Sequence, residues 1–190
     1  MDEDHATAEA LNFARARDGD RNAFGEIVVL YKDSLVNYLT RMTGSREEAE
    51  DIAQETFLRL IERSGNYTEQ GKLKAYIFRT ATNLLKSKAR QLSRRRALRL
   101  IFLSPNGNQA PPGQQAEVLQ DELQAQLQIA LQGLPVHYRL PVVLYDIEDW
   151  SYNQIADVLK CREGTVKSRI FRGRRLLRES LEPYWRETQA

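Results

Sequence analysis

A stretch rich in proline and glycine, residues 104–116, divides the chain into two regions that both show the apolar spacing of α-helices. Its Pro105, Pro111, Pro112, Gly107 and Gly113 are incompatible with a regular helix or strand. On either side of it, apolar residues recur at intervals of three and four, and few segments alternate as strands do. The chain is therefore predicted to be all-α, with two small helical domains joined by a flexible linker.

The domain boundaries follow from this stretch and from the residues beside it. We place a first domain, a helical bundle, at residues 1–99, the linker at 100–117, and a second domain at 118–190. The 190 residues, 42% of them hydrophobic, allow two modest cores. If residues 104–116 are extended, they span about 40 Å, so the domains can reach separate sites. The apolar stretch Leu98–Leu103 either packs back on the first domain or contacts a partner.

Charge is distributed unevenly along the chain, although the formal net charge is only +2. No acidic residue occurs between Gln70 and Ala116, a span that holds ten lysines and arginines. Eight more basic residues lie between Lys160 and Arg178, with Glu163 as the one acid among them. A solvated helix face usually carries both signs of charge. Two basic tracts on an acidic background therefore predict two contacts with a polyanion such as nucleic acid.

Several classes of protein are disfavoured by the composition. No stretch approaches the roughly 20 apolar residues of a membrane span, and the acidic N-terminus does not resemble a secretory signal. Cys161 is the only cysteine, and His5 and His137 are the only histidines, so we expect no disulfide, no metal site and no cofactor. A soluble cytoplasmic protein without membrane insertion is predicted.

The first domain is predicted to contain four helices. The first covers residues 6–17, and the second residues 23–42, with Gly44 as its end. Ser45 and Glu48 have the spacing of a capping box that begins a third helix, to about residue 63. After a loop at residues 64–71, a long basic helix begins near Leu73.

The second domain carries the pattern of a helix-turn-helix. A helix from about residue 118 is followed by Pro135, at the first position of the next helix, and by Pro141, where we expect a kink or a helix restart. Ser151 and Gln154 form a second capping box before a short helix. After a turn at residues 160–162, a basic second helix has Val166 and Ile170 inward. Such a helix fits the major groove of DNA.

Three motifs, in order, resemble the extracytoplasmic-function (ECF) sigma factors, group IV of the sigma-70 family. Residues 134–139, 151–159 and 164–172 (LPVHYR, SYNQIADVL and GTVKSRIFR) resemble that family's promoter-binding domain. Residues 49–60 (AEDIAQETFLRL) resemble its polymerase-binding helix, and residues 75–83 (AYIFRTATN) its strand-opening helix. The resemblance spans about residues 24–181. It implies a sigma factor, a DNA-binding initiation subunit of bacterial RNA polymerase that is not an enzyme.

The resemblance also implies which residues bind DNA at the minus-thirty-five element. Positions that face bases or the groove in the family are occupied by Lys167, Ser168, Phe171 and Arg172. Phosphate contacts are implied for Tyr152, Arg162, Thr165 and Arg169. On helical spacing alone, Phe171 fits a core position equally well.

For the minus-ten element, the resemblance implies that the loop captures an unstacked base and that the basic helix contacts the duplex. The corresponding pocket and backbone residues are Asn66, Tyr67, Lys72 and Lys74, and the duplex residues are Arg79, Asn83, Lys86 and Arg90. Tyr76 stands where tryptophan is common and is expected to keep a packing role. Ser87 stands where aspartate or asparagine is common, which leaves the base preference open.

The implied partners are promoter DNA, an anti-sigma factor and the core RNA polymerase. Asp51, Gln54, Glu55 and Phe57 would dock on the clamp helices of the polymerase largest subunit. Asp51, Gln54 and Glu55 share a helix face, because their spacing is i, i+3, i+4. Phe57 also fits the core.

Two alternative functions remain at this point. The first is a helix-turn-helix activator or repressor that acts without joining polymerase, which leaves the motifs of the first domain unexplained. The second is a nucleic-acid hydrolase with magnesium held by Asp146, Glu148 and Asp149. No pair of nucleophile and base accompanies those acids.

Overall fold

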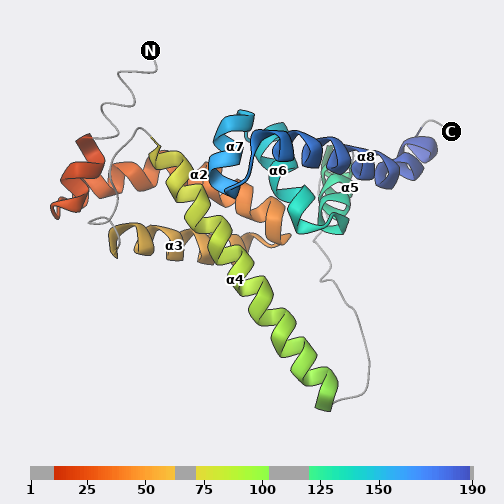
Figure 1. Ribbon diagram of the computed structural model, residues 1–190, viewed down its shortest axis with the longest axis horizontal. Coiled ribbons are helices and arrows are strands. Elements are labelled where there is room, and N and C mark those ends of the chain that lie inside the picture. The colour runs from red at the N-terminus through yellow and green to blue at the C-terminus, as the bar shows by residue number, and fades with distance from the viewer. Residues whose placement is uncertain (1–10, 63–71, 103–119, 189–190) are drawn as a thin grey trace.

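The computed structural model describes residues 11–62, 72–102 and 120–188, and for residues 92–102 it describes the backbone alone. In these ranges the regular elements are all α-helices, so the all-α prediction is confirmed. A short helix at residues 11–17 precedes the labelled helices of Figure 1. These are α2 (Arg21–Thr43), α3 (Arg46–Glu62), α4 (Leu73–Phe102), α5 (Gln120–Gly133), α6 (Val136–Asp146), α7 (Tyr152–Leu159) and α8 (Glu163–Thr188). Residues 6–10, the loop at 64–71 and the stretch at 104–116 lie outside the described residues.

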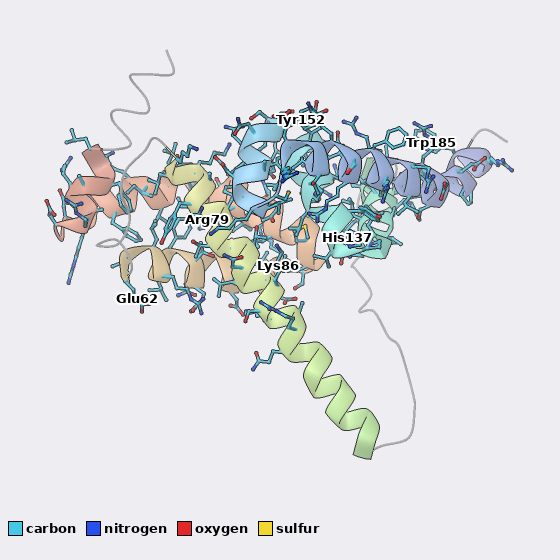
Figure 2. The ribbon with its side chains drawn as sticks, viewed as in Figure 1. Glu62, Arg79, Lys86, His137, Tyr152 and Trp185 are labelled. Atoms are coloured by element: carbon cyan, nitrogen blue, oxygen red, sulfur yellow. The ribbon has the colours of Figure 1, made fainter. Side chains whose placement is uncertain are left out.

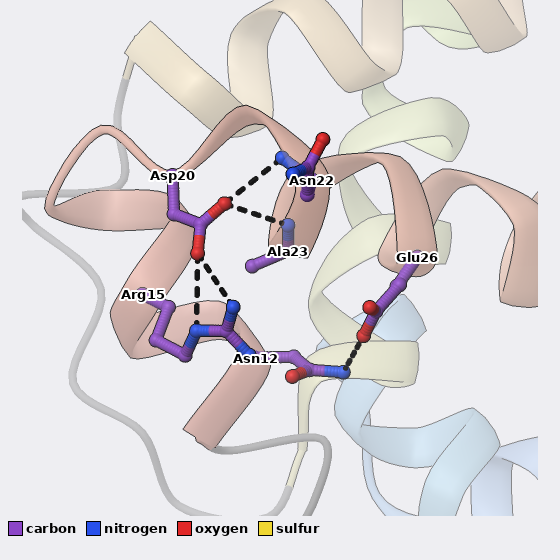
Figure 3. A network of polar contacts seen from close by, with 6 residues as sticks. All are labelled: Asn12, Arg15, Asp20, Asn22, Ala23 and Glu26. Atoms are coloured by element: carbon purple, nitrogen blue, oxygen red, sulfur yellow. Dashed lines mark hydrogen bonds and ion pairs between the residues drawn. The ribbon is translucent and has the colours of Figure 1, made fainter.

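The start of α2 is fixed by the side chain of Asp20 (Figure 3). Its carboxylate accepts hydrogen bonds from the backbone N–H groups of Asn22 and Ala23, at 2.9 and 3.1 Å. The same carboxylate pairs with Arg15 at 2.7 Å, which ties the preceding helix to this cap. These donors lower the pKa of Asp20, first through the Ala23 N–H. The cap therefore orients the first two helices relative to each other.

The turn between α2 and α3 follows the sequence prediction with one difference. Gly44 ends α2 in the left-handed conformation at φ 79°, as its lack of a side chain allows. Ser45 Oγ accepts the backbone N–H of Glu48, as one half of a capping box does. The N–H of Ser45 instead donates to Thr43 Oγ1 at 3.1 Å. The nearby threonine hydroxyl therefore takes the place predicted for the Glu48 carboxylate.

Helices α2, α3 and α4 pack around a common apolar core. Tyr38, Ile52, Leu60, Ile77 and Phe78 are almost fully buried in it. The Tyr38 hydroxyl pairs with Thr82 Oγ1 at 2.8 Å, so this buried polar group has a partner. Burial of the phenol raises its pKa. The first domain is thus held by side chains at the helical spacing seen in the sequence.

Helices α5 to α8 form the second group. Pro135 lies one residue outside α6, at its N-cap, rather than at the first helical position. Of the kink or helix restart predicted at Pro141, the restart is wrong, because α6 runs as one helix through this residue. The proline removes the N–H that would bond the carbonyl of His137, which lies at an exposed position where water is available. The helix therefore continues.

The two groups of helices are packed against each other. A single cluster of buried side chains continues from Leu35 and Phe78 in the first group to Trp150 and Leu144 in the second. Helix α2 contacts α5 and α6, and α4 contacts α7. Figure 1 shows α7 beside the N-terminal half of α4, whose C-terminal half projects away from the other helices. None of the described helices is both long enough and apolar enough to cross a membrane.

Candidate nucleic-acid interface

Helices α7 and α8 form the predicted helix-turn-helix. Ser151 and Gln154 make a complete capping box at the start of α7. Lys160 ends α7 in the left-handed conformation at φ 50°, which reverses the chain into α8. The side chains of Ile155 and Val166 are fully buried between the helices. Local caps and one small core therefore fix the angle at which α8 is presented.

The N-terminal half of α8 presents an exposed face. Lys167, Ser168 and Arg172 are exposed, and Phe171 is 73% exposed. The core alternative for Phe171 is therefore wrong. Aromatic and basic side chains on one turn of a protruding helix suit contacts with base edges and phosphates. All four side chains are thus accessible to solvent on the N-terminal half of α8.

Tyr152 and Lys167 join the start of α7 to α8. The ring of Tyr152 stacks on Tyr145 at 4.6 Å, and Lys167 Nζ lies 5.1 Å from the Tyr152 ring centre. Lys167 also pairs with Glu163 at 2.7 Å, and this hydrogen bond raises the pKa of the ammonium. Lys167 therefore stays charged, and its pair with Glu163 is solvent-exposed and so contributes little to stability.

The other implied phosphate contacts lie around the turn. Arg162 is exposed before α8, whereas Thr165 and Arg169 are partly buried. The guanidinium of Arg169 is 4.0 Å from the sulfur of Cys161. Arg169 also affects Lys86 of α4, whose pKa is lowered first by burial and then by this neighbouring charge. Arg169 thus faces the first domain and not the outer face that carries Phe171.

A second basic surface follows α4. Asn83 and Arg90 are exposed on it, and Arg79 lies partly buried with its guanidinium 5.3 Å from the ring centre of Tyr76. Tyr76 packs against the core, so its predicted packing role is confirmed. Figure 2 shows Arg79 and Lys86 along α4, and Tyr152 at the start of α7. Asn66 and Tyr67 lie outside the described residues.

Three basic residues, one just before α4 and two within it, meet the helix-turn-helix region. Lys72 pairs with Asp157 of α7 at 2.8 Å. Lys74 Nζ lies 5.0 Å from the ring centre of Trp150, and Lys86 is half-buried beside Arg169. The α4 surface is therefore partly covered, which nothing in the local sequence pattern indicates.

Helix α3 carries the residues expected to bind polymerase. Asp51 and Gln54 are exposed, and Glu55 pairs with Arg59 at 2.8 Å. Phe57 is 6% exposed and therefore belongs to the core. It also lines a mostly apolar groove between α2 and α3, together with Phe24, Val28, Lys32, Val36, Glu50, Ala53, Gln54 and Leu58. The polar face thus borders an apolar groove, which the helical pattern of α3 alone does not reveal.

Two of the three acidic residues considered for magnesium lie beside basic side chains. Asp146 pairs with Arg174 of α8. Glu148 lies near Lys74 and Arg41, and burial raises the pKa of its carboxyl. In the ranges that the structure describes, no three histidine, cysteine or acidic side chains gather as metal ligands. Asp146 therefore links α6 to α8, and Glu148 lies near basic side chains of α4 and α2.

Comparison with known proteins gives two family matches and several relatives. Residues 27–95 match the model for sigma-70 region 2, and residues 124–177 match that for sigma-70, region 4. The chain is 34% identical over 188 residues to the ECF RNA polymerase sigma factor SigE of Mycolicibacterium smegmatis, which covers 97% of this chain and 72% of the relative. It is also 34% identical over 174 residues to the ECF sigma factor SigW of Bacillus subtilis, covering 88% and 93% of the two chains.

A similar solved structure is that of the sigma factor RpoE in complex with the anti-sigma factor NepR from Bartonella quintana. The TM-score is 0.66 at 25% sequence identity, and the match covers 84% of this chain and 96% of that one. The likeness includes both groups of helices.

Proposed function

Because the chain belongs to the ECF sigma factors of the sigma-70 family, we propose that its two basic surfaces bind the two elements of one promoter. It is an RNA polymerase sigma factor and not an enzyme. We assign minus-ten binding to residues 1–99 and minus-thirty-five binding to residues 118–190, with residues 100–117 between them. The observation that carries the assignment is the exposed face of α8, with Phe171 at 73% exposure on a capped helix-turn-helix.

The minus-thirty-five element is bound by the N-terminal half of α8. Lys167, Ser168, Phe171 and Arg172 enter the major groove, where basic groups reach guanine acceptors and the phenyl ring contacts thymine methyl groups. Phosphates on either side are contacted by Tyr152, Arg162, Thr165 and Arg169. Arg169 faces α4 here, so its contact requires the two domains to move apart.

The minus-ten element is bound and opened along α4 and the loop before it. Arg79, Asn83, Lys86 and Arg90 contact the duplex, while Asn66, Tyr67, Lys72 and Lys74 hold the extracted base and its backbone. Extraction of a base costs a few kcal/mol of stacking, which the pocket offsets with its own stacking and hydrogen bonds. The run of basic residues without acids on α4 supports this role.

Core polymerase is bound through α3. Asp51, Gln54 and Glu55 present a polar face to the clamp helices of the largest subunit, and Phe57 forms the wall of the adjoining groove. Polar residues around an apolar groove are a common arrangement at protein interfaces. We propose a cytoplasmic location, because a protein that binds core polymerase and promoter DNA acts there. The related structure with NepR supports an anti-sigma factor as a further partner.

Reconstituted transcription tests this assignment. Core bacterial RNA polymerase plus the full chain should give run-off products that start at discrete sites, and sequencing of their 5′ ends should reveal two shared upstream elements. Core polymerase alone is the control. A chain that binds promoter duplex tightly without core polymerase, and gives no core-dependent initiation, would instead be a free-standing helix-turn-helix regulator.

A further inference from the structure

Two tyrosine rings lie between two basic side chains of α8. The rings of Tyr145 in α6 and Tyr152 in α7 are stacked, with centres 4.6 Å apart and an interplanar angle of 5°. Lys167 Nζ lies over the Tyr152 ring, 5.1 Å from its centre, and the guanidinium of Arg174 lies 5.1 Å from the centre of the Tyr145 ring. Cations are attracted to the faces of aromatic rings at such distances. These four side chains form what we call the aromatic stack, in the order Lys167, Tyr152, Tyr145 and Arg174.

The aromatic stack borders the exposed face of α8. Lys167 and Arg174 are seven residues apart, which is about two helical turns, so they lie on one flank of the helix. Lys167 is also part of the exposed face that carries Ser168 and Phe171. The stack therefore joins the exposed face to the two helices that support α8.

The Arg174 end of the stack is fixed by the close packing of α6 on α8. A Cβ on Gly173 would lie 2.6 Å from Val142 Cγ2, so a larger residue there would displace Val142 or push the helices apart. Val142 and Tyr145 are three residues apart and share a face of α6, which brings the Tyr145 ring against α8. Arg174 also pairs with Asp146, and this hydrogen bond raises the pKa of its guanidinium. Tyr145 thus stands on a rigid part of the domain.

The Lys167 end of the stack is open to solvent. The Lys167 side chain is 55% exposed, and a lysine loses much rotamer freedom when it is ordered against DNA. Its ammonium is held by Glu163 on one helix and by the Tyr152 ring on another. Tyr152 is the first residue of α7, and its partly exposed ring is supported by Tyr145. A side-chain hydrogen bond with Tyr145 is also the main cause that raises the pKa of Tyr152.

We propose that Tyr145 is a positioning residue for recognition of the minus-thirty-five element, because it fixes the Tyr152 ring that holds the Lys167 ammonium at the edge of the exposed face. The inference rests on the proposed function, since it requires Lys167 to contact DNA. Tyr145 acts through its neighbours and not by touching the duplex. A side chain that is ordered before binding raises affinity, because less conformational entropy is lost in the complex.

Substitutions at Tyr145 with and without Lys167 test this role. Tyr145→Leu removes the ring but keeps an apolar side chain, and Tyr145→Phe keeps a ring that can stack. Tyr138→Leu is the matched control, because Tyr138 is a partly buried tyrosine two turns earlier on α6 that also lies against Gly173 but outside the stack. The probe is a fluorescein-labelled duplex that contains the minus-thirty-five element located by run-off transcription. Fluorescence anisotropy with the full chain gives the affinities.

Tyr145→Leu should lower affinity for the probe about fivefold, and Tyr145→Phe less than twofold. In a Lys167→Ala background, Tyr145→Leu should cost less than about twofold, because the side chain that it positions is already gone. Tyr138→Leu should change affinity by the same small factor in both backgrounds. A fivefold loss from Tyr145→Leu both with and without Lys167 would overturn the proposal, since a merely structural residue acts equally in both. A loss from Tyr145→Phe as large as that from Tyr145→Leu would overturn the role of stacking.

Nuclear magnetic resonance of the free protein reports the position of Lys167 directly. The Tyr152 ring should shift the signals of the Lys167 methylene beside the ammonium upfield in protein labelled with ¹³C-lysine, and Lys167→Arg identifies those signals. Tyr145→Leu should reduce this shift by more than half, whereas Tyr138→Leu should leave it unchanged. An unreduced shift would overturn the positioning role.

The same binding data separate this inference from the proposed function. Normal probe binding by Lys167→Ala would contradict recognition through Lys167, and the role of Tyr145 would fail with it. Weakened binding by Lys167→Ala, together with equal losses from Tyr145→Leu in both backgrounds, would overturn the role of Tyr145 alone.

Discussion

The two basic surfaces of this protein differ in how far they are available to DNA. The outer face of α8 is exposed, and its Lys167 contacts only residues of the helix-turn-helix, Glu163 and the ring of Tyr152, among the contacts described above. The surface of α4 is partly occupied, because Lys72 and Lys86 meet residues of the second domain. Two surfaces with similar sequence character therefore have different accessibility. The difference shows that charge along a sequence identifies a nucleic-acid surface, but packing decides when it is free.

The largest expected effect tests the exposed outer face of α8. Lys167→Ala with Arg172→Ala should lower affinity for the minus-thirty-five duplex roughly 100-fold, because two contacts of about 1–3 kcal/mol each are removed. Fluorescence anisotropy measures this affinity, with a labelled duplex that contains the minus-thirty-five element located by run-off transcription. Arg186→Ala, an exposed arginine near the far end of α8, is the control and should have little effect. Normal promoter use by the double variant would remove α8 as the recognition helix.

The next effect separates polymerase binding from both DNA surfaces. Gln54→Ala with Glu55→Ala should weaken binding to core polymerase roughly thirtyfold, since two polar contacts of about 1 kcal/mol each are lost. Asp33→Ala with Asn37→Ala, at exposed positions of α2, is a control of similar composition. Surface plasmon resonance gives the affinities, and circular dichroism checks that the helices are intact. Undiminished binding would contradict the role of α3.

A smaller effect compares the free and the covered parts of α4. Arg90→Ala should lower duplex affinity about threefold and reduce the salt slope by about 0.9, as expected for one phosphate contact. Lys86→Ala should lower duplex affinity by less than Arg90→Ala does, because Lys86 is already half-buried beside Arg169. Titrations at several salt concentrations measure both. Equal losses would show that α7 and α8 do not restrict Lys86.

The smallest effect concerns α7, the helix that packs against α8 and supports its exposed face. Ser151→Ala removes the capping box of α7 and should lower the free energy of unfolding by about 1 kcal/mol. This loss lowers Tm by about 2–4 °C. Differential scanning calorimetry measures the change. Asn153→Ala, at an exposed position on the same helix, should leave Tm almost unaltered. A drop of the same size in both variants would mean that the cap is not what holds α7.

The sequence alone determined most of the helices, two of their ends and the helix-turn-helix of this protein. Gly44 and the Ser151–Gln154 box were predictable because a helix end depends on residues within four positions. Val166 and Ile170 were predicted as core from their spacing, and both are buried. The resemblance of three sequence motifs to those of ECF sigma factors also indicated the family. The expectation of a restart at Pro141 failed because propensity is a weak guide where tertiary packing holds a helix together.

Only the tertiary structure decided how the two domains meet. The bond from Arg139 to the Met42 carbonyl joins residues 97 positions apart, and that from Lys72 to Asp157 joins residues 85 apart. No periodicity or cap encodes such pairs, because they depend on the path of the chain between them and on which surfaces fit. Phe78 shows this directly: it lies on α4 in the first domain, but Trp150 of the second domain became evident as its neighbour only in the folded chain.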